Sequence, residues 1–544
     1  MNALFLMVLV VVSFIVAFRF YGRYLEKLWD VSSEKKTPAH TKYDGIDYIP
    51  AKHWIVLFGH HFSSIAGAGP ILGPVIAGVV WGWGPALLWI VFGSIFLGAV
   101  HDFSSLILSL RYDGQSVGQV TKDILGERVK LVFSFFLWLA LILVIAVFAA
   151  VTAKTFVEEP RIVIPSFAFI FIAVAFGFLV YKKNANLILT TLFSLLLMAG
   201  FLYAGKHMPV ILAGTNPVKT WIVILLVYSF IASVLPVNIL LQPRDYLSSF
   251  ILLFGLFFGL LGIIVSHPST NAPFFISFNS SKGPLMPMMF VIIACGAISG
   301  FHGLISSGTT SKQLPDEKYS RHIAFGSMLT EGVLAAIALL CVCAGLYWNS
   351  PFQELNYPFL MQKGDWIGTF AIGYGNIVSK IFTSDIGKLI AMIMVNSFVL
   401  TTLDTATRIT RYITSEIFGE SFKIKIFNNR FFSTLLILVF ASYLAFGAWE
   451  KIWPVFGASN QLVAALILFV CSCFLMMKKK NSLSVLIPAL IMLVITMMAL
   501  IYQANTFYKS HHLLLGNISV ILVLLAAFIV VEGVKVIKKI RNST

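Results

Sequence analysis

A succession of long apolar stretches constrains the fold of this 544-residue chain more than any other feature. About 15 of them contain roughly 20 apolar residues, the length that a helix needs to span the hydrocarbon core of a bilayer. Only 11% of the residues are charged, whereas soluble domains have about 25%. The longest polar stretch, Tyr21 to Lys52, is too short for a soluble domain. The sequence therefore predicts an all-α polytopic membrane protein in which residues 1–544 form a single integral membrane domain.

The net charge of +16 comes mainly from basic residues in short connections between the apolar stretches. The positive-inside rule produces this distribution, which indicates a cytoplasmic surface facing anionic lipids rather than a nucleic-acid partner. The first stretch, Ala3 to Ala17, is followed by Arg19, Arg23 and Lys27, the reverse of a cleaved signal peptide. We therefore expect a retained first span, an external N-terminus and a cytoplasmic C-terminus.

The span predicted at 54–80 contains helix-breaking residues near its middle: Gly67, Gly69, Pro70 and Pro74. In a bilayer, such a break survives only where protein or a water-filled cavity surrounds it, because unpaired backbone groups are costly in lipid. Proline removes one N–H from the helix, so the carbonyl of Ala66 could coordinate a cation. The N–H groups after the break could hold a carboxylate. The alternative is that the glycines only allow close helix packing.

Two adjacent histidines, His60 and His61, precede this break. Successive side chains on a helix point about 100° apart, so these two cannot face the same way. Either histidine could carry a proton or hydrogen-bond a substrate carboxylate. The alternative is a hydrogen-bonded histidine between helices. The same two interpretations apply to His302.

A second predicted span, 286–308, resembles the first. The pattern G-x-H-x5-G occurs at Gly59, His61 and Gly67, and again at Gly300, His302 and Gly308. If the connections alternate sides, the two spans run in opposite directions, and interrupted segments at corresponding positions are typical of inverted-repeat transporters. We expect a substrate site between the first break and a second break near Ser306 to Thr309. Its expected residues are His60, His61, Ala66, Gly67, Gly69, Pro70, Ser299, His302, Ser306, Ser307 and Thr309.

Acidic residues inside predicted spans are candidates for proton coupling. Asp102 lies in span 84–110 and Glu331 in span 322–347. Ionisable groups at such depth are usually functional. We expect protons to pass through His60 or His61, with Asp102 or Glu331 as the partner.

Sodium is the rival coupling ion. It would be bound by carbonyl groups near Ala66 and by the hydroxyl groups of Thr401 and Thr402, since carbonyls freed at a helix break bind sodium in transporters of this kind. Sodium-dependent uptake at fixed pH would favour this mechanism.

Six further polar residues are candidates for gating or for structure: Arg244, Asp245, Asp404, Arg408, Asn460 and Gln461. The first two fall in a predicted cytoplasmic loop, 242–248, where they would latch a gate or fix the loop. Asp404 precedes Arg408 by four residues, so we expect a helical ion pair between them. Asn460 and Gln461 are expected to hydrogen-bond neighbouring helices.

The sequence contains no enzymatic signature such as H-E-x-x-H, a Walker A motif or G-x-S-x-G. A metal site built from His60, His61, His101 and Asp102 is conceivable, but no spacing demands it. We expect neither a cofactor nor a bound metal, and we do not expect an enzyme.

Six segments resemble the carbon starvation protein A (CstA) family: Trp54 to Val75, Gly98 to Phe103, Gln242 to Phe250, Gly300 to Leu314, Thr401 to Arg408 and Ile452 to Leu462. The resemblance covers residues 50–480 and leaves the apolar stretches at 484–532 as extra C-terminal helices. His101 stands where the family often has glutamine, which argues against a role that requires this histidine.

The resemblance implies a multi-pass carrier of the bacterial inner membrane that imports nutrients in starvation. Members of the family are associated with uptake of peptides and with proton-driven uptake of pyruvate. They are grouped with the amino acid–polyamine–organocation superfamily, whose core is a five-plus-five inverted repeat with two broken helices. Spans 54–80 and 286–308 would be those helices, although six spans separate them here instead of four.

The sequence therefore predicts a secondary active transporter for a small carboxylate-bearing nutrient, with a peptide or pyruvate as candidate substrate. Proton coupling is the preferred mechanism and sodium coupling the rival. A channel, a membrane sensor and an intramembrane enzyme are the alternatives from other classes. A channel would conduct far faster than a carrier, a sensor would need an output domain, and an enzyme would form product without a gradient.

Overall fold

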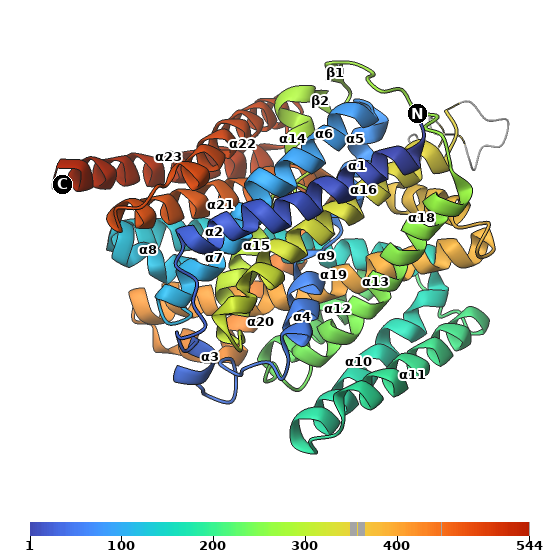
Figure 1. The fold of residues 1–544 in the computed structure, drawn as a ribbon, viewed down its shortest axis with the longest axis horizontal. Helices are drawn as coiled ribbons and strands as arrows, with labels where there is room; N and C mark the ends of the chain where they lie inside the picture. The colour runs from blue at the N-terminus through green and yellow to red at the C-terminus, as the bar shows by residue number, and fades with distance from the viewer. Residues whose placement is uncertain (349–355, 357–358, 360–364, 448, 543–544) are drawn as a thin grey trace.

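The computed structural model describes residues 1–348, 356, 359, 365–447 and 449–542 (Figure 1). Its helices in the first half are α1 (Ala3–Val16), α2 (Gly22–Leu28), α3 (Pro38–Thr41), α4 (Trp54–Ile65), α5 (Gly69–Val80), α6 (Trp83–Gly93), α7 (Ala99–Arg111), α8 (Val117–Leu125), α9 (Glu127–Glu158), α10 (Val163–Gly177), α11 (Leu187–His207), α12 (Pro217–Val234) and α13 (Leu241–Ser266). A two-stranded ribbon of β1 (Asn279–Ser280) and β2 (Gly283–Pro284) comes next. The helices after the ribbon are α14 (Phe290–Ile292), α15 (Gly300–Gly308), α16 (Gly326–Gly345), α18 (Trp366–Ile377), α19 (Ser384–Thr414), α20 (Arg430–Ala445), α21 (Trp449–Met477), α22 (Leu483–Lys509) and α23 (Leu513–Asn542).

Within this described part of the chain, 12 helical segments are long and apolar enough to cross a membrane, and α4 with α5 would make 13 as one span bent by 45°. Two stretches counted in the sequence do not meet the same criterion. The stretch at 431–448 corresponds to α20, which has only 16 residues. The stretch at 286–308 is divided among short helices that include α14 and α15. The protein is thus an all-α, multi-pass membrane protein, with a helix or a broken pair at each predicted span.

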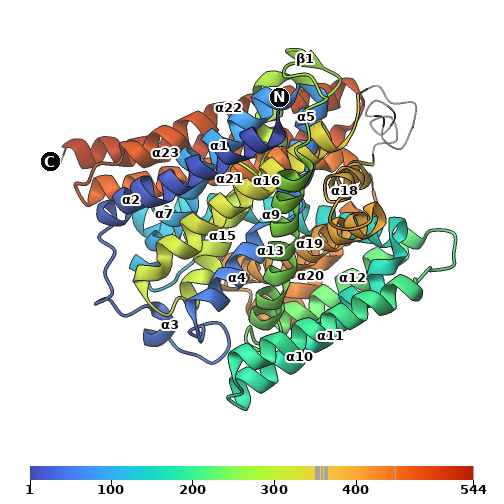
Figure 2. The same ribbon diagram turned by 45° about the vertical axis from the view of Figure 1, so that its right-hand side comes forward.

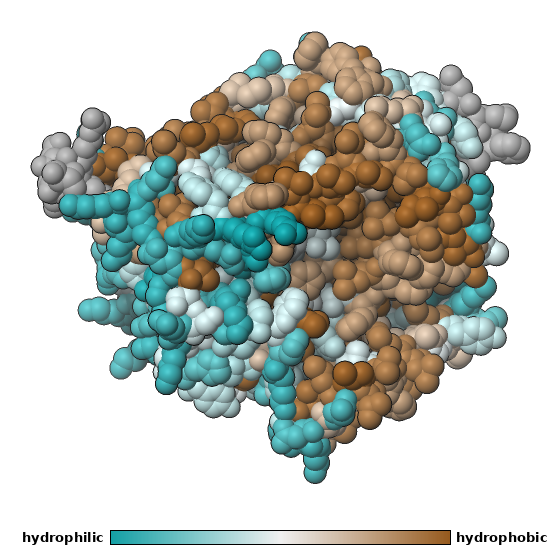
Figure 3. All heavy atoms as spheres, viewed as in Figure 1, coloured by the Kyte–Doolittle hydropathy of each residue, from teal (hydrophilic) through white to brown (hydrophobic). Residues whose placement is uncertain are grey.

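The surface separates into an apolar and a hydrophilic part. Figure 3 shows apolar residues over α1, α13 and α16, whereas hydrophilic residues gather at the end of the molecule where α2, α3 and α8 lie. We refer to this end, which includes residues 30–53, as the hydrophilic end. The exposed apolar side chains include Phe5, Leu9 and Val12 on α1, as expected for helices in contact with lipid.

The helices pack in two sets with reciprocal contacts. The first set is α4–α5, α6–α7, α9, α12 and α13, and the second is α14–α15, α16, α19, α20 and α21. In the described structure α5 packs on α16 as α15 packs on α7, and α4 packs on α13 as α14 packs on α21. The same correspondence holds for α9 with α12 and α19 with α20, and for α9 with α20 and α19 with α12. A five-plus-five repeat requires this reciprocity.

The hairpin of α10 and α11 lies outside this reciprocal set. Figures 1 and 2 show it along one edge of the molecule, where it packs mainly against α13. Leaving it out reduces the six spans between the two interrupted segments to four. The hairpin thus supplies two of the six spans between the interrupted segments and makes none of the reciprocal contacts.

Candidate functional site

The first interrupted segment breaks where the sequence predicts. The helix α4 ends at Ile65, and Ala66 then takes a non-helical conformation with φ −73° and ψ 82°. The next helix, α5, starts at Gly69 with Pro70 in its first turn, where a missing N–H costs nothing. Ile71 and Leu72 donate their N–H groups to the Ala68 carbonyl at 3.2 and 2.9 Å. With no side-chain cap on this end, α5 therefore presents the Gly69 N–H and a positive dipole end at the break.

The second interruption lies at residues 293–299, between α14 and α15. The prediction of a break near Ser306 to Thr309 was wrong in position, because Ser306 and Ser307 lie inside α15 and Thr309 caps its far end. The glycines that suggested the break serve close packing instead. A Cβ on Gly303 would come within 2.7 Å of the His101 ring, for example. Of the predicted second-break residues, only Ser299 lies at the interruption.

The two interruptions face each other. A Cβ on Gly69 would lie 2.5 Å from the Sγ of Cys295, and a Cβ on Gly296 would lie 3.5 Å from the Cα of Pro70. In addition, α4 packs on α15 and α5 packs on α14. The first half of each broken helix thus contacts the second half of the other, which is the arrangement of two antiparallel broken helices.

Polar side chains from α21 hold the second interruption open. The amide of Asn460 donates to Ser299 Oγ at 2.9 Å and accepts from the backbone N–H of Phe301, also at 2.9 Å. The Gln461 amide donates to the carbonyl of Phe290 at 2.9 Å. These contacts confirm that Asn460 and Gln461 bond to a neighbouring helix, and they show that this helix is the broken one.

Gly73 provides a test of this close approach. A Cβ at this position would lie 2.4 Å from the carbonyl oxygen of Ile292, and overpacking of this kind costs about 1–3 kcal/mol. We expect Gly73→Ala to lower the thermal unfolding temperature and slow transport. Gly200→Ala on α11 is the matched control, because its Cβ would meet nothing within 4 Å. Equal stability of the two variants would contradict the packing shown here.

A line of buried ionisable groups connects α7, α15 and α16 next to this site. His302 Nδ1 lies 3.1 Å from Asp102 Oδ2, and His302 Nε2 lies 3.4 Å from Glu331 Oε2. His101 Nδ1 approaches the other Asp102 oxygen at 2.8 Å. All four side chains are fully buried. Within the described residues, neither Glu331 oxygen has a hydrogen bond of ordinary length.

The geometry of these side chains favours one proton shared between His302 and Glu331, in addition to the single N–H of a neutral His302. His302 has a carboxylate near each ring nitrogen, but a neutral imidazole has only one N–H. Both contacts are attractive when His302 is charged, or when His302 is neutral and Glu331 carries the proton. Removing that proton turns one contact into a repulsion between a lone pair and a carboxylate. The line can therefore load and release one proton between His302 and Glu331.

His60 and His61 have other partners than the sequence predicted. His60 Nδ1 lies 2.7 Å from Asp245 Oδ2, and His61 Nδ1 lies 2.8 Å from the hydroxyl of Thr310. Asp102 and Glu331, the expected partners of these histidines in proton coupling, contact His302 instead. Sequence spacing could not show this, since His302 comes from a different helix.

The residues assigned to a loop at 242–248 form the first turns of α13, and they are buried. Arg244 pairs with Asp245 at 2.9 Å and also with Asp404, while Tyr228 Oη donates to Asp404 at 2.6 Å. The predicted pair of Asp404 with Arg408 was wrong. Arg408 pairs instead with Asp47 at 3.0 Å, because tertiary contacts outweigh the small energy of an i,i+4 pair.

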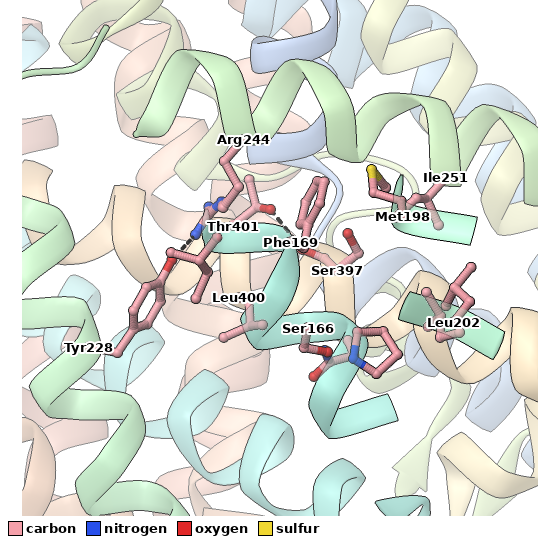
Figure 4. Close-up of a pocket in the computed structure, with 14 residues that line it drawn as sticks. Ser166, Phe169, Met198, Leu202, Tyr228, Arg244, Ile251, Ser397, Leu400 and Thr401 are labelled. Atoms are coloured by element: carbon pink, nitrogen blue, oxygen red, sulfur yellow. Dashed lines mark hydrogen bonds between the residues drawn. The ribbon is translucent and has the colours of Figure 1, made fainter. Parts of the chain in front are cut away.

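A small cavity of about 30 Å³ lies between the α10–α11 hairpin and the core. Figure 4 shows Arg244, Tyr228, Ser397 and Thr401 on its core side, with Met198 and Leu202 on the hairpin side. Its residues do not include the two interruptions. Arg244 therefore forms the buried ion pairs and also lines this lateral cavity, which was not predicted from the sequence.

Thr401 and Thr402 point to different places. Thr401 lines the lateral cavity, whereas Thr402 Oγ1 lies 3.3 Å from the carbonyl oxygen of Ser64, at the end of α4. Thr402 would also contact a Cβ on Gly67 at 3.2 Å. Only Thr402 is thus placed beside the first break. Among the described residues there is no group of three or more His, Cys, Asp or Glu arranged to hold a metal ion.

Comparison with known proteins places these features in context. The family model described as carbon starvation protein CstA matches residues 2–365 and 353–499. The peptide transporter CstA of Bacillus subtilis is 35% identical, with 98% of this chain and 97% of that protein covered. The pyruvate/proton symporter BtsT of Escherichia coli is 29% identical, with 92% and 81% covered. These relatives are transporters, not enzymes.

Solved structures show the same fold at low sequence identity. A manganese transporter of Eremococcus coleocola, solved with an aromatic bis-isothiourea compound, has a TM-score of 0.52 at 13% identity and covers 92% of this chain and 99% of its own. MhsT in complex with L-phenylalanine has a TM-score of 0.50 at 11% identity, covering 82% and 98%. At these identities the likeness concerns the fold alone.

Proposed function

Because the chain belongs to the carbon starvation protein CstA family, we propose that it is a proton-coupled secondary transporter that imports a small carboxylate-bearing nutrient. The candidate substrates are pyruvate and short peptides, since its relatives are named for these. The observation that carries the proposal is the pair of facing interruptions beside a buried line of ionisable groups that can load one proton.

The substrate would lie between the two interruptions. The Gly69 N–H at the start of α5 and the positive end of the helix dipole suit a carboxylate. Gly67 and Gly69 allow the close approach of a ligand to the backbone. Ser299, at the second interruption, adds a hydroxyl group that is already oriented by Asn460. His61 lies one turn before the first break and would contact the substrate from α4.

Proton binding would take place at His302 and Glu331, with Asp102 holding the imidazole. His302 lies in the first turn of α15, so a change in its charge acts on the helix that starts at the second interruption. A proton on this line and a carboxylate between the breaks attract each other, which favours binding of the two together. This link between proton and substrate is what a symporter requires.

Orientation follows from the distribution of charge. We assign the hydrophilic end to the cytoplasm, since the connections there contain most of the basic residues. The N-terminus is then external and the C-terminus cytoplasmic, and the membrane is the inner membrane of a bacterium. Anionic lipids would contact the basic connections, and import in carbon starvation would be the cellular role.

Sodium coupling is a second candidate, and one observation favours it. The hydroxyl of Thr402 lies beside the carbonyl of Ser64 and beside Gly67, at the first break. Oxygen atoms gathered at an unwound helix end are the kind of ligands that bind sodium in transporters with broken helices. Thr401 is not available for such a site, because it lines the lateral cavity.

Uptake by proteoliposomes under imposed gradients tests the proposal. Labelled pyruvate and a panel of dipeptides would be offered with a pH gradient in sodium-free buffer, and with a sodium gradient at equal pH. We expect accumulation above equilibrium with the pH gradient alone. Accumulation that requires sodium and ignores pH would establish the rival mechanism instead. Flux without accumulation under either gradient would indicate a channel.

A further inference from the structure

Three basic residues gather around Asp47 at the hydrophilic end. Lys312 follows α15, while Arg408 and Arg411 lie on the last turns of α19. Lys312 Nζ lies 4.6 Å from the ring centroid of Tyr412, and the Arg411 guanidinium lies 4.5 Å from the same ring. Tyr412 and Arg408 both hydrogen-bond to Asp47. We call Lys312, Arg408 and Arg411 the basic cluster.

The basic cluster has unused hydrogen-bonding capacity. Arg411 is only 7% exposed, and its Nε and Nη2 have no hydrogen-bond partner among the described residues. Arg408 Nε is also buried without a partner in that part of the chain. Buried guanidinium nitrogens normally bond to an acceptor. Neither Arg411 nor Lys312 forms an ion pair within the described structure, so the cluster has unused donors for an anion besides Asp47.

Loop 42–53 holds the Asp47 side chain against the basic cluster. The Asp44 carboxylate accepts the backbone N–H groups of Ile46, Asp47 and Tyr48 at 2.8, 2.9 and 2.9 Å, which fixes the turn. Burial opposes ionisation of Asp47, but Arg408, Lys312 and Tyr412 together hold its pKa below the usual value. Burial also lowers the pKa of Lys312, although Asp47 and Glu416 oppose this. Glu416 itself is engaged by the Ser116 hydroxyl at 3.0 Å.

The helix α15 connects the second interruption to the basic cluster. From the second interruption, α15 carries Ser306, whose buried hydroxyl has no partner in the described structure. The chain then reaches Thr310, which is bonded to His61 at 2.8 Å, and two residues later Lys312. The basic cluster therefore lies at the end of α15 that is opposite to the second interruption.

We propose that the basic cluster is a carboxylate-binding station on the cytoplasmic side of the pathway, which Asp47 occupies while the pathway is closed and which the carboxylate of the substrate occupies once loop 42–53 withdraws. This inference rests on the proposed transport function. It makes Asp47 an internal competitor of the substrate. The station acts at one face only, because the facing interruptions, not the cluster, meet substrate arriving from outside.

Half-saturating concentrations measured separately at the two faces test the station. Oriented proteoliposomes would be given labelled pyruvate or dialanine on either side. Arg411→Gln should raise the cytoplasmic value about tenfold, as for loss of a charge-assisted hydrogen bond, and leave the external value unchanged. Asp47→Asn should lower the cytoplasmic value, because the competitor is weakened. Lys122→Gln, an exposed base on α8 paired with Glu127 at 2.7 Å, is the control and should change neither.

The outcomes separate this inference from the proposed function. If the wild type accumulates neither probe under any gradient, the transport proposal itself fails. If the wild type transports normally but Arg411→Gln changes the half-saturating concentrations at both faces alike, or at neither, the station is refuted. It is also refuted if Asp47→Asn leaves the cytoplasmic half-saturating concentration unchanged.

A lipid headgroup is the other anion that the basic cluster could bind, and vesicles of phosphatidylcholine alone exclude an anionic lipid. An effect of Arg411→Gln seen only with added phosphatidylglycerol would mean that the anion is a lipid headgroup, and it would overturn the proposal. Should Arg411→Gln not fold, Arg411→Lys is expected to give the same one-sided change at smaller size.

Discussion

Glu331→Gln is expected to abolish proton-driven accumulation while leaving substrate exchange intact. Gln has the shape of the protonated acid but cannot release the proton, so the line from Asp102 through His302 stays in its loaded form. When one proton accompanies each substrate, a pH gradient of one unit supports about tenfold accumulation, or about 1.4 kcal/mol. We expect the variant to reach a ratio of about one under the same gradient.

Exchange of labelled for unlabelled substrate across the membrane gives the necessary second readout. It needs the substrate site and the conformational change but no net proton movement, so Glu331→Gln should retain it. Glu127→Gln makes the same chemical change at a carboxylate that is 58% exposed, and it should behave as the wild type in both assays. Full accumulation by Glu331→Gln would remove Glu331 from the proton pathway.

Arg244→Gln is expected to cause the largest loss of stability. Arg244 is 2% exposed and pairs with Asp245 and Asp404, both of which are fully buried. Removing the cation leaves two buried carboxylates without their common partner, and breaking a buried ion pair in this way costs about 3–5 kcal/mol. Thermal unfolding of the detergent-solubilised protein, followed by size-exclusion chromatography, measures the effect.

A double variant distinguishes charge imbalance from loss of packing. Arg244→Gln with Asp404→Asn removes one of the stranded charges, so part of the lost stability should return. Arg128→Gln, at an exposed position in the first turn of α9, should change stability by no more than about 0.5 kcal/mol. If the single variant were as stable as the wild type, the buried network would not hold α12, α13 and α19 together.

The sequence predicted structure best where a residue affects the backbone hydrogen bonds of its own helix. Pro70 and the glycines beside it predicted the first break correctly, because proline changes hydrogen bonding at known positions in its own helix. The second break was misplaced, since Gly300 and Gly303 have no such fixed effect. A Cβ on Gly300 would meet the Asn460 carbonyl at 2.3 Å, so this glycine reflects contact with another helix. A glycine pattern alone cannot separate a break from close packing.

Pairings between distant segments were not predictable from spacing. Asp404 and Arg408 are four residues apart, yet each pairs with a residue more than 100 positions away. In the same way, His302 lies 200 residues from Asp102 in sequence, and no local pattern indicates that it connects two acids. The six spans between the two interrupted segments were visible in the sequence, but only the helix contacts showed that the α10–α11 hairpin lies outside the reciprocal set.

We propose a coupling in which one proton crosses the membrane with each substrate molecule through His302 and Glu331. Its most direct test is the luminal pH of proteoliposomes that contain a trapped pH indicator, in sodium-free buffer without an imposed gradient. The account predicts that external substrate acidifies the lumen in the wild type and does not do so in Glu331→Gln. Entry of labelled substrate into wild-type vesicles with no change in luminal pH would contradict it.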